Sequence, residues 1–338
     1  MSKTILVAGG AGFIGVNFIK FMLRENPGVK IVNFDALTYA GNLASLADCE
    51  NNPDYEFFHG DIRNDKDVAS AIKKYNVDSI INFAAESHVD RSIDGPHVFL
   101  DTNILGTYTL LQAARDFGIQ RFLQVSTDEV YGSLGKEGMF TESTSIKPNS
   151  PYSASKASAD HLVRSWHKTY DLNAVITRCS NNYGAYQFPE KMIPLCINNA
   201  RHNNKIPVYG DGMQVRDWLY VYDHCTAIWA VFDRAAPGEV FNIGGNNEKT
   251  NLTLVNSILA MLGKSKGLIQ FVKDRPGHDR RYAIDSSKMK EKLGWEPSVT
   301  FEQGIEKTIK WYMDNQAWLD QVTSGDYQNY YKQMYHQR

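Results

Sequence analysis

The sequence predicts an α/β fold: a doubly wound parallel sheet with a smaller mixed α/β lobe toward the C-terminus. Short apolar runs rich in Ile, Val and Phe alternate with helix-like segments through about the first 180 residues. This alternation is typical of a parallel sheet with helices on both faces. A glycine-rich turn joins the first apolar run to the first helical segment, and the regular alternation fades beyond about residue 180. These observations together favour a nucleotide-binding sheet followed by a second lobe.

Each element of the first half is predicted from its hydrophobic period. The helical segments carry apolar residues at helical spacing, and Ile104, Thr107, Leu111 and Ala114 illustrate it. The predicted strands are Thr4–Ala8, Lys30–Phe34, Tyr55–His59, Ser79–Phe83, Arg121–Ser126 and Asn173–Thr177. The predicted helices between them are Phe13–Leu23, Asp65–Lys74, Asn103–Phe117 and Ser153–Tyr170.

The second half is interrupted by Asn, Pro and Gly, which indicates a less regular lobe over the sheet. We expect a dinucleotide-binding domain over residues 1–180 and a substrate lobe over residues 181–330. The segment near 221–243 contains the strand-like Val240–Asn242, which could complete the first sheet. The helices predicted here are Met192–Asn203, Val221–Arg234, Thr253–Leu262 and Phe301–Asp314.

Composition excludes several classes of protein. The 338 residues are 43% hydrophobic and can bury a full core, and the net charge of -2 with dispersed Lys and Arg gives no footprint for nucleic acid or an anionic membrane. No apolar run approaches the roughly 18 residues of a membrane span, and no signal-peptide layout is present, so cytoplasmic residence is expected. No metal site or disulfide framework is indicated by the widely spaced cysteines Cys49, Cys179, Cys196 and Cys225.

The glycine-rich turn predicts a Rossmann cofactor site. Gly9, Gly12 and Gly15 follow the first strand and open the first helix. Glycines at this spacing permit a tight turn, close approach of the backbone to a pyrophosphate, and close packing of helix on strand. The N–H groups of the helix N-terminus would then face the anion.

Acidic residues at the ends of the next strands indicate which dinucleotide binds. Asp35 ends the second strand, where a carboxylate accepts hydrogen bonds from a ribose 2′-hydroxyl and repels a 2′-phosphate. No Arg follows Asp35 closely in the sequence, so NAD is favoured over NADP. Asp61 follows the third strand, and it is equally consistent with a place beside the adenine and with a turn or helix cap.

Tyr152 and Lys156 lie four residues apart, hence on one face of a helix. A nearby ammonium lowers the cost of a phenolate, so Tyr152 is a candidate base for a substrate alcohol. Together with the glycine turn and with Ser126–Thr127 at a strand end, the pair resembles the active site of short-chain dehydrogenases/reductases. The glycine spacing resembles the extended branch of that family, whose members act mainly on nucleotide sugars. The resemblance covers nearly the whole chain, including Val215–Val221 and Leu293–Pro297.

Asp128 and Glu129 directly follow the strand that ends at Ser126. Adjacent acids in such a place are commonly a solvated loop or a helix cap, and plain hydride transfer needs neither. Loss of water from carbon, however, needs a base and an acid. Within the family, Thr127–Asp128–Glu129 followed by Val130–Tyr131–Gly132 is similar to the nucleotide-sugar 4,6-dehydratases. Asp128 resembles those that act on dTDP-glucose, because GDP-mannose dehydratases more often have Ser there.

The resemblance implies a redox cycle that ends in dehydration, with a 4-keto-6-deoxy sugar as product and NAD, tightly bound, regenerated in each turnover. Tyr152 takes the proton of the C4 hydroxyl with Thr127 bonded to the same oxygen, Glu129 removes the C5 proton, and Asp128 protonates the departing C6 hydroxyl. The catalytic set is Thr127, Asp128, Glu129, Tyr152 and Lys156.

The same resemblance implies two further sets of residues. The cofactor set is Gly9, Gly12, Phe13, Ile14, Gly15, Asp35, Leu37, Thr38, Asp61, Ile62, Phe83, Ala84, Ala85, Thr102, Tyr152, Lys156 and Asn182. The set for the nucleotide-sugar substrate is Ser87, Thr127, Asn181, Lys191, Met192, Pro207, Val208, Tyr209, Arg216, Asn251, Asp274, Arg275 and His278. His88 is either a site residue or a structural one, and the Gln187–Glu190 turn could shape the pocket.

Other functions remain open from the sequence. A nucleotide-sugar 4-epimerase would use Tyr152, Lys156 and NAD, but Asp128 and Glu129 would have no catalytic role in it. A dehydratase that acts on another nucleotide-hexose is a further alternative. A sensor or scaffold that only binds NAD would need none of the catalytic set. The resemblance also implies a homodimer that pairs through Asn103–Phe117 and Ser153–Tyr170, and a place in cell-surface sugar synthesis such as that of dTDP-rhamnose.

Overall fold

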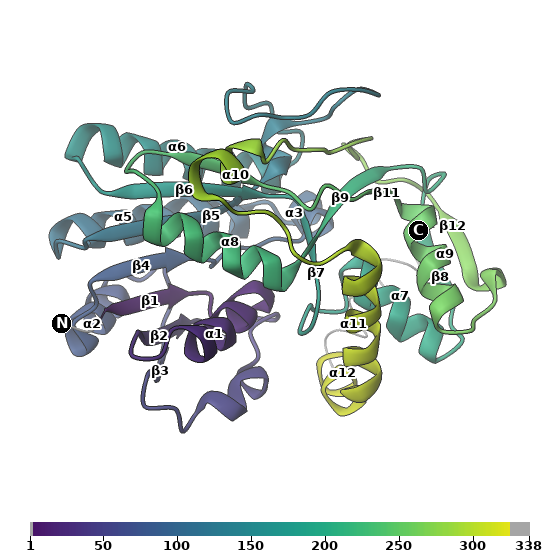
Figure 1. The fold of residues 1–338 in the computed structure, drawn as a ribbon, viewed down its shortest axis with the longest axis horizontal. Helices are drawn as coiled ribbons and strands as arrows, with labels where there is room; N and C mark the ends of the chain where they lie inside the picture. Colours follow the sequence, from purple (N-terminus) through teal and green to yellow (C-terminus); the bar gives the residue numbers. More distant parts are fainter. Residues whose placement is uncertain (1–2, 325–338) are drawn as a thin grey trace.

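A seven-stranded parallel sheet forms the centre of the molecule in the computed structural model, which describes residues 3–324 (Figure 1). The strand order is β3-β2-β1-β4-β5-β6-β10, and every neighbouring pair is parallel. The order switches direction between β1 and β4, where open α/β sheets bind their ligands. The strands are β1 (Thr4–Ala8), β2 (Lys30–Asp35), β3 (Tyr55–His59), β4 (Ser79–Asn82), β5 (Arg121–Thr127), β6 (Ala174–Cys179) and β10 (Val240–Ile243).

Helices cover both faces of this sheet, because successive side chains of each strand point to opposite sides. In β1, Ile5 and Val7 pack into one apolar cluster, whereas Leu6 and Ala8 pack into another. The first cluster is covered by α1 (Phe13–Glu25), α8 (Val221–Arg234) and α10 (Ser287–Leu293). The second is covered by α2 (Asp65–Tyr75), α5 (Thr107–Asp116) and α6 (Pro151–Tyr170).

The second lobe lies beside the sheet and has a core of its own (Figure 1). A three-stranded sheet pairs β9 in parallel with β7 and antiparallel with β11, and β8 pairs in parallel with β12. Its strands are β7 (Asn181–Tyr183), β8 (Ile206–Tyr209), β9 (Val215–Tyr220), β11 (Glu248–Thr250) and β12 (Ile269–Val272). Its helices are α7 (Met192–Arg201), α9 (Asn251–Met261), α11 (Phe301–Asp314) and α12 (Gln316–Val322).

The predicted fold class is confirmed, and the predicted strands and helices of the sheet region are present with ends shifted by a few residues. β10 pairs with β6, so the segment after α8 returns to the first sheet. The division at residue 180 stays a prediction, and residues 325–330 of the predicted lobe lie outside the described part of the chain.

One predicted helix has a different beginning. The segment expected to start at Asn103 lies in a π-helical stretch, η2 (Leu100–Gly106), which continues into α5. At the junction a Cβ on Gly106 would lie 2.5 Å from Cδ1 of Ile62, so glycine permits close packing there. Short elements that the periodicity did not predict are α3 (Val89–Asp94), α4 (His97–Phe99), η1 (Leu43–Cys49), η3 (Asp128–Tyr131) and η4 (Lys266–Leu268).

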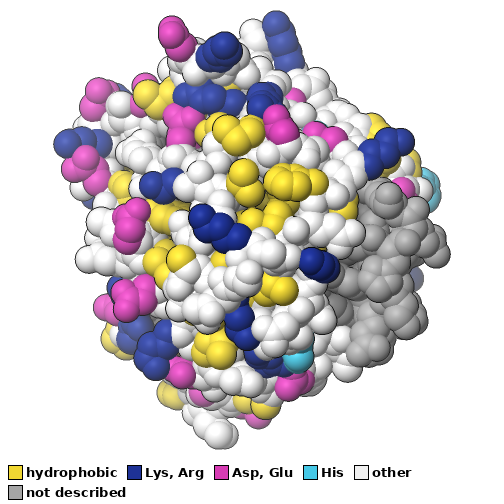
Figure 2. All heavy atoms as spheres, turned by 90° about the vertical axis from the view of Figure 1, so that its right-hand side faces the viewer, with side chains coloured by type: hydrophobic (Ala, Val, Ile, Leu, Met, Phe, Trp, Pro, Cys, Tyr) yellow, Lys and Arg dark blue, Asp and Glu magenta, His cyan; other side chains and the backbone are white. Residues whose placement is uncertain are grey.

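The charged side chains of the surface and the four cysteines can be located in the structure. On the face of the molecule shown in Figure 2, Lys and Arg side chains are interspersed with Asp and Glu. All four cysteines are buried and unpaired. Within residues 3–324, no helix has the length and apolar character needed to cross a membrane, and no cluster of His, Cys, Asp and Glu is arranged to hold a metal ion.

Candidate active site

The glycine turn between β1 and α1 has the shape that close backbone approach requires. Gly9 has a φ of 77°, and a Cβ there would lie 2.6 Å from the backbone nitrogen of Ala84. A Cβ on Gly15 would lie 2.2 Å from the carbonyl oxygen of Gly9. Gly12 is the N-cap of α1 and adds no side chain over the first turn, so the N–H groups there stay open to an anion.

Two cavities flank this turn. One, of about 150 Å³, lies at the ends of β2 and β3, and the other, of about 250 Å³, lies between β5, α6 and β7. The first is lined by the predicted cofactor residues Gly9, Gly12, Asp35, Thr38, Asp61, Ile62, Phe83, Ala84, Ala85 and Thr102. The second is lined by Phe13, Ile14, Gly15, Ser87, Thr127, Glu129, Tyr152, Lys156, Asn181, Asn182 and Lys191, together with Gly9, Gly12, Phe83 and Ala85.

Asp35 is held at the mouth of the first cavity. Its two carboxylate oxygens accept the backbone N–H groups of Ala11 and Leu37, each at 2.8 Å. Leu37 therefore meets the carboxylate through its backbone, with a left-handed φ of 51°. Asp35 is 8% exposed, and burial raises its pKa while these two N–H groups act against that rise.

Arg63 also lines the first cavity, and sequence reasoning did not predict it. Its Nε lies 2.9 Å from an oxygen of Asp61, and its backbone N–H donates to the same carboxylate at 2.8 Å. Asp61 thus forms a turn and lines the cavity at once. The Arg63 guanidinium is bound by the Asp61 carboxylate.

Tyr152 and Lys156 lie on the first turns of α6, which begins with a capping box between Ser150 and Ser153. Lys156 donates from Nζ to the carbonyl oxygen of Val125 at 2.7 Å. Burial raises the pKa of Tyr152 well above its usual value and nearby Glu129 raises it further, whereas a hydrogen bond with Thr127 lowers it. The expected help of Lys156 toward a phenolate is therefore opposed by burial and by Glu129.

Asp128 begins η3 directly after β5 and lies in the interior. Thr127 caps this turn by accepting the N–H of Glu129 at 3.2 Å, and its hydroxyl lies 3.3 Å from Oδ1 of Asp128. Asp128 is 2% exposed, and its Oδ2 makes no hydrogen bond within residues 3–324. Burial raises the pKa of Asp128 well above its usual value, and the charges of Glu129 and Asp217 raise it further. Burial and these two charges therefore favour the protonated form of the side chain.

Glu129 has cationic neighbours that Asp128 largely lacks. Burial raises its pKa, but Arg275, Arg216 and Lys191 all act in the opposite direction. These cations approach from the loop after β12, from β9 and from the N-cap of α7. The environments of the two adjacent acids thus differ, which is the arrangement that separates an acid from a base.

The predicted substrate cations are anchored by the protein itself. Lys191 donates from Nζ to the carbonyl oxygen of Ser87 at 2.7 Å. Arg216 donates to the carbonyl oxygen of Asp279 at 3.0 Å and lies over the ring of Tyr282, 4.3 Å from its centroid. These cations lie near Glu129, so the predicted anion site and the predicted base share one region.

Other predicted substrate residues have varied placements. Tyr209 ends β8, Met192 and Asn251 begin α7 and α9, and Pro207 is on β8. Val208 is fully buried in the core of the second lobe. His278 bonds through Nδ1 to Asp274 at 2.6 Å. His88 caps α3 by accepting the N–H of Arg91 at 3.5 Å, and burial lowers its pKa to about 4.

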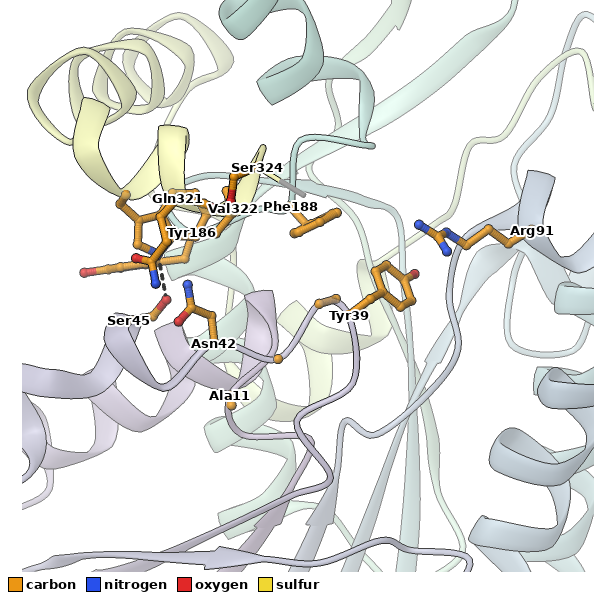
Figure 3. Close-up of a pocket in the computed structure, with 13 residues that line it drawn as sticks. Ala11, Tyr39, Asn42, Ser45, Arg91, Tyr186, Phe188, Gln321, Val322 and Ser324 are labelled. Atoms are coloured by element: carbon orange, nitrogen blue, oxygen red, sulfur yellow. Dashed lines mark hydrogen bonds between the residues drawn. The ribbon is translucent and has the colours of Figure 1, made fainter. Parts of the chain in front are cut away.

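A further network crosses the mouth of the cofactor cleft, and sequence spacing did not reveal it. Tyr39 donates its hydroxyl to Oε1 of Glu190 at 2.9 Å, and Arg91 pairs with Oε2 at 3.0 Å. The Arg91 guanidinium also lies 4.0 Å from the centroid of the Tyr39 ring. Figure 3 shows Tyr39 and Arg91 directed toward each other beside a third cavity of about 440 Å³. The sequence indicates Glu190 only as part of the Gln187–Glu190 turn.

Comparisons with known proteins identify the family. Residues 6–308 match the family model described as GDP-mannose 4,6 dehydratase. A dTDP-glucose 4,6-dehydratase of Xanthomonas campestris pv. campestris is 54% identical, with 96% of this chain and 97% of the relative covered. This chain belongs to the dTDP-glucose 4,6-dehydratase family. Membership of this family agrees with the presence of the adjacent acids Asp128 and Glu129 near Tyr152.

Solved structures of other dTDP-glucose 4,6-dehydratases have the same fold. The enzyme from Bacillus anthracis, in complex with NAD, is 52% identical with a TM-score of 0.89, covering 95% of this chain and 99% of that chain. The enzyme from Streptomyces venezuelae, also with NAD bound, is 46% identical with a TM-score of 0.92, covering 94% of this chain and 99% of that chain.

The cleft of this dehydratase family member fits a dinucleotide. The glycine turn leaves room for close approach of a pyrophosphate, and Asp35 lines the same cavity as Gly9 and Gly12. Asn181 and Asn182 on β7 line the second cavity, and each has a buried side-chain oxygen without a hydrogen bond among residues 3–324. Those oxygens are acceptors for a bound cofactor or substrate.

The network at the cleft mouth predicts how this dehydratase retains its cofactor. Thr38, Ala40 and Gly41 line the first cavity, and Tyr39 at the tip of this loop is fastened to Glu190. Tyr39→Phe removes that hydrogen bond and keeps the ring, so NAD should dissociate about tenfold faster, as expected for losing roughly 1.5 kcal/mol. The rate is measured by chasing bound NAD with labelled NAD. Tyr186→Phe in the neighbouring cavity is the matched control, and an unchanged rate in Tyr39→Phe would refute the retaining role.

Proposed function

We propose that this protein converts dTDP-glucose to dTDP-4-keto-6-deoxyglucose, a hydro-lyase reaction with NAD as a bound and regenerated hydride carrier. The observation that carries the proposal is the contrast between Asp128, whose pKa is raised by burial and by neighbouring acids, and Glu129, on which three cations act to lower the pKa. An acid and a base side by side are what the removal of water requires. An epimerase that uses Tyr152 and Lys156 would need neither acid.

The first step is oxidation at C4. NAD, when bound, would supply the hydride acceptor for oxidation at C4 and the hydride donor for reduction at C6. Tyr152 accepts the proton of the C4 hydroxyl, and its hydrogen bond with Thr127 favours the phenolate that this requires. Lys156, fixed to the Val125 carbonyl at 2.7 Å, holds its charge on the same helical face as Tyr152. The resulting 4-keto group acidifies the C5–H bond.

The second step is elimination across C5 and C6. Glu129 removes the C5 proton, and the nearby cations Arg275, Arg216 and Lys191 favour its ionised form before that transfer. Asp128 gives its proton to the C6 hydroxyl, and the oxygen leaves as water. Return of hydride to C6, with return of the Glu129 proton to C5, completes the 4-keto-6-deoxy sugar.

The proton balance gives Thr127 a second task. At the end of the cycle Tyr152 holds a proton that it lacked at the start, and Asp128 has lost one. Thr127 bonds to both side chains, at 3.3 Å to Oδ1 of Asp128. Its hydroxyl can therefore pass a proton toward Asp128 while it receives one from Tyr152, which restores both groups for the next turnover.

The reaction is tested by incubating the protein with dTDP-glucose and examining the product by mass spectrometry and by the base-induced chromophore of 4-keto sugars. We expect a product lighter by one water that gives this chromophore. UDP-glucose, CDP-glucose and GDP-mannose assayed in parallel test the choice of nucleotide. A product of unchanged mass would favour the epimerase and contradict the proposal, and no product with any of the four would favour a sensor or scaffold.

We also propose that two copies pair through η2, α5 and α6, and that the enzyme works in the cytoplasm. Exposed apolar side chains concentrate on these helices: Leu105 is 55% exposed, Tyr108 is 45% exposed and Tyr170 is 44% exposed. Tyr108 and Tyr170 pack on either side of Trp166, with ring centroids 5.8 Å and 5.4 Å from it. An apolar face of this kind is stabilised by a second copy.

The pairing predicts the effect of a charge on this face. Leu105→Glu would bury a carboxylate between the copies, so the protein should change from a dimer to a monomer in light scattering at micromolar concentration. Met261→Glu is the matched control, because Met261 is 49% exposed at the end of α9 in the other lobe. A wild-type mass equal to one chain, or a Leu105→Glu dimer, would refute this interface.

A further inference from the structure

Asp90, on the first turn of α3, connects the sheet to two residues of the second lobe. Its Oδ2 accepts the hydroxyl of Tyr209 at 2.7 Å, and its Oδ1 pairs with Nη1 of Arg275 at 3.0 Å. Asp90 is 1% exposed. The partners lie 119 and 185 residues away in the sequence, so this one carboxylate fixes two distant segments to the sheet.

The carboxylate is ionised although it is buried. Burial alone would raise the pKa of Asp90, but Arg275 and the Tyr209 hydrogen bond together bring it below its usual value. A buried charge is costly unless its partners hold it well. Both oxygens of Asp90 are occupied, so the site meets that requirement.

The Asp90 carboxylate does not bind a diphosphate directly, because both groups are negatively charged. Asp90 lies in the region of Lys191 and Arg275, where the diphosphate of a nucleotide sugar would bind under the proposed function. Its charge repels phosphate, so it acts through the residues that it holds. Arg275 can bind both Asp90 and a phosphate group, because a guanidinium has five N–H donors in a fixed plane.

Arg275 keeps donors available beyond the pair with Asp90. Its Nη1 is taken by Asp90, whereas its buried Nε has no hydrogen-bond partner within the part of the chain that the structure describes. Its charge also acts on the base Glu129. The guanidinium is thus fixed at one nitrogen, and the remaining donors can meet phosphate oxygens beside the catalytic acids.

We propose that Asp90 is a positioning residue, which orients Arg275 and Tyr209 so that they bind the diphosphate portion of the substrate. The inference rests on the proposed function, because it takes a nucleoside diphosphate sugar as the ligand. It adds a residue of α3 that contacts no substrate atom and sets substrate affinity through two residues of the other lobe.

The test compares Asp90→Asn with Asp94→Asn in the NAD-loaded protein. Asp94 is an exposed acid on the same helix, so its variant makes the same change of charge without the contacts. Asp90→Asn should bind dTDP about tenfold more weakly by calorimetry, equal to about 1.4 kcal/mol. Thymidine, which has no phosphate, should lose less than about threefold in affinity. With dTDP-glucose, KM should rise about tenfold while kcat stays within about threefold.

A double-mutant cycle separates positioning from general structural damage. If Asp90 acts through Arg275 and Tyr209, adding Asp90→Asn to Arg275→Gln should lower dTDP affinity only by the part that acts through Tyr209, about threefold, and not by the full tenfold. Equal affinity, or tighter binding, in Asp90→Asn would overturn the proposal, and so would a full additional loss in the double variant. If Asp90→Asn does not fold, judged by NAD content and circular dichroism, Tyr209→Phe takes its place and should weaken dTDP binding about threefold; an unchanged affinity there would overturn the proposal. A wild-type protein that does not bind dTDP would instead contradict the proposed function.

Discussion

Glu129→Gln should form NADH on mixing with dTDP-glucose and then stop. Gln keeps the size and hydrogen bonding of the side chain but cannot accept the C5 proton, so oxidation at C4 proceeds and elimination does not. Turnover should fall about 10³-fold. Stopped-flow absorbance of the bound cofactor should show a rise in NADH that persists, where the wild-type signal decays as hydride returns to C6.

The same experiment has a clear control. Glu142→Gln changes an acid that lines neither cavity of the site and accepts the backbone N–H of Asn242, and the cofactor signal of this variant should follow the wild-type course. Normal turnover in Glu129→Gln would remove Glu129 from the role of base. Failure to form NADH at all would place Glu129 in the oxidation step instead.

Asp128→Asn should slow the loss of water about 10²-fold while oxidation at C4 continues. An amide cannot protonate the departing hydroxyl. Burial raises the pKa of Asp128 in the folded protein, so the proton it needs is present below that raised pKa and is lost as the pH rises through it. The wild-type rate of elimination should therefore fall on the alkaline side, and this fall should be absent from the residual rate of Asp128→Asn.

Thermal unfolding separates this effect from damage to the fold. Above the ordinary Asp pKa of about 3.9 the unfolded wild-type chain is ionised whereas burial in the folded protein opposes ionisation, so at neutral pH Asp128→Asn, which is neutral in both states, should unfold at a midpoint no lower than that of the wild type. As the pH rises, the wild-type protein loses stability because the unfolded chain releases the proton more readily than the folded one. Asp128→Asn should lack that loss. An unaltered elimination rate in this variant would exclude Asp128 as the acid.

The sheet and the cofactor turn were predictable because local patterns specify them. Buried parallel strands are continuous apolar runs, and the spacing of Gly9, Gly12 and Gly15 is a local motif, although the close contact at Gly9 is with the distant Ala84. Helical spacing places Tyr152 and Lys156 on one face, and their catalytic roles came from the resemblance. The break at Gly95 and Pro96 and the π-helical η2 were not predicted, because hydrophobic period does not distinguish a π-helix from an α-helix.

The surroundings of the site were not predictable from spacing. Tyr39 and Glu190 are 151 residues apart, and Asp90 and Arg275 are 185 apart. An isolated Asp or Tyr has no pattern until the fold brings its partner near. Lys191, Arg216 and Arg275 were named by resemblance, and only the structure brings all three to act on Glu129. The raised pKa of Tyr152 likewise depends on burial, which the sequence does not measure.

The most direct test of the account follows one hydrogen through the reaction. dTDP-glucose carrying deuterium at C4 is converted by the protein in ordinary water, and the product is examined by mass spectrometry and NMR. If Tyr152, Glu129 and Asp128 act as proposed around a bound NAD, the product is lighter by one water and carries the deuterium at C6. Deuterium that stays at C4 in a product of unchanged mass, or that is lost to solvent, would contradict the account.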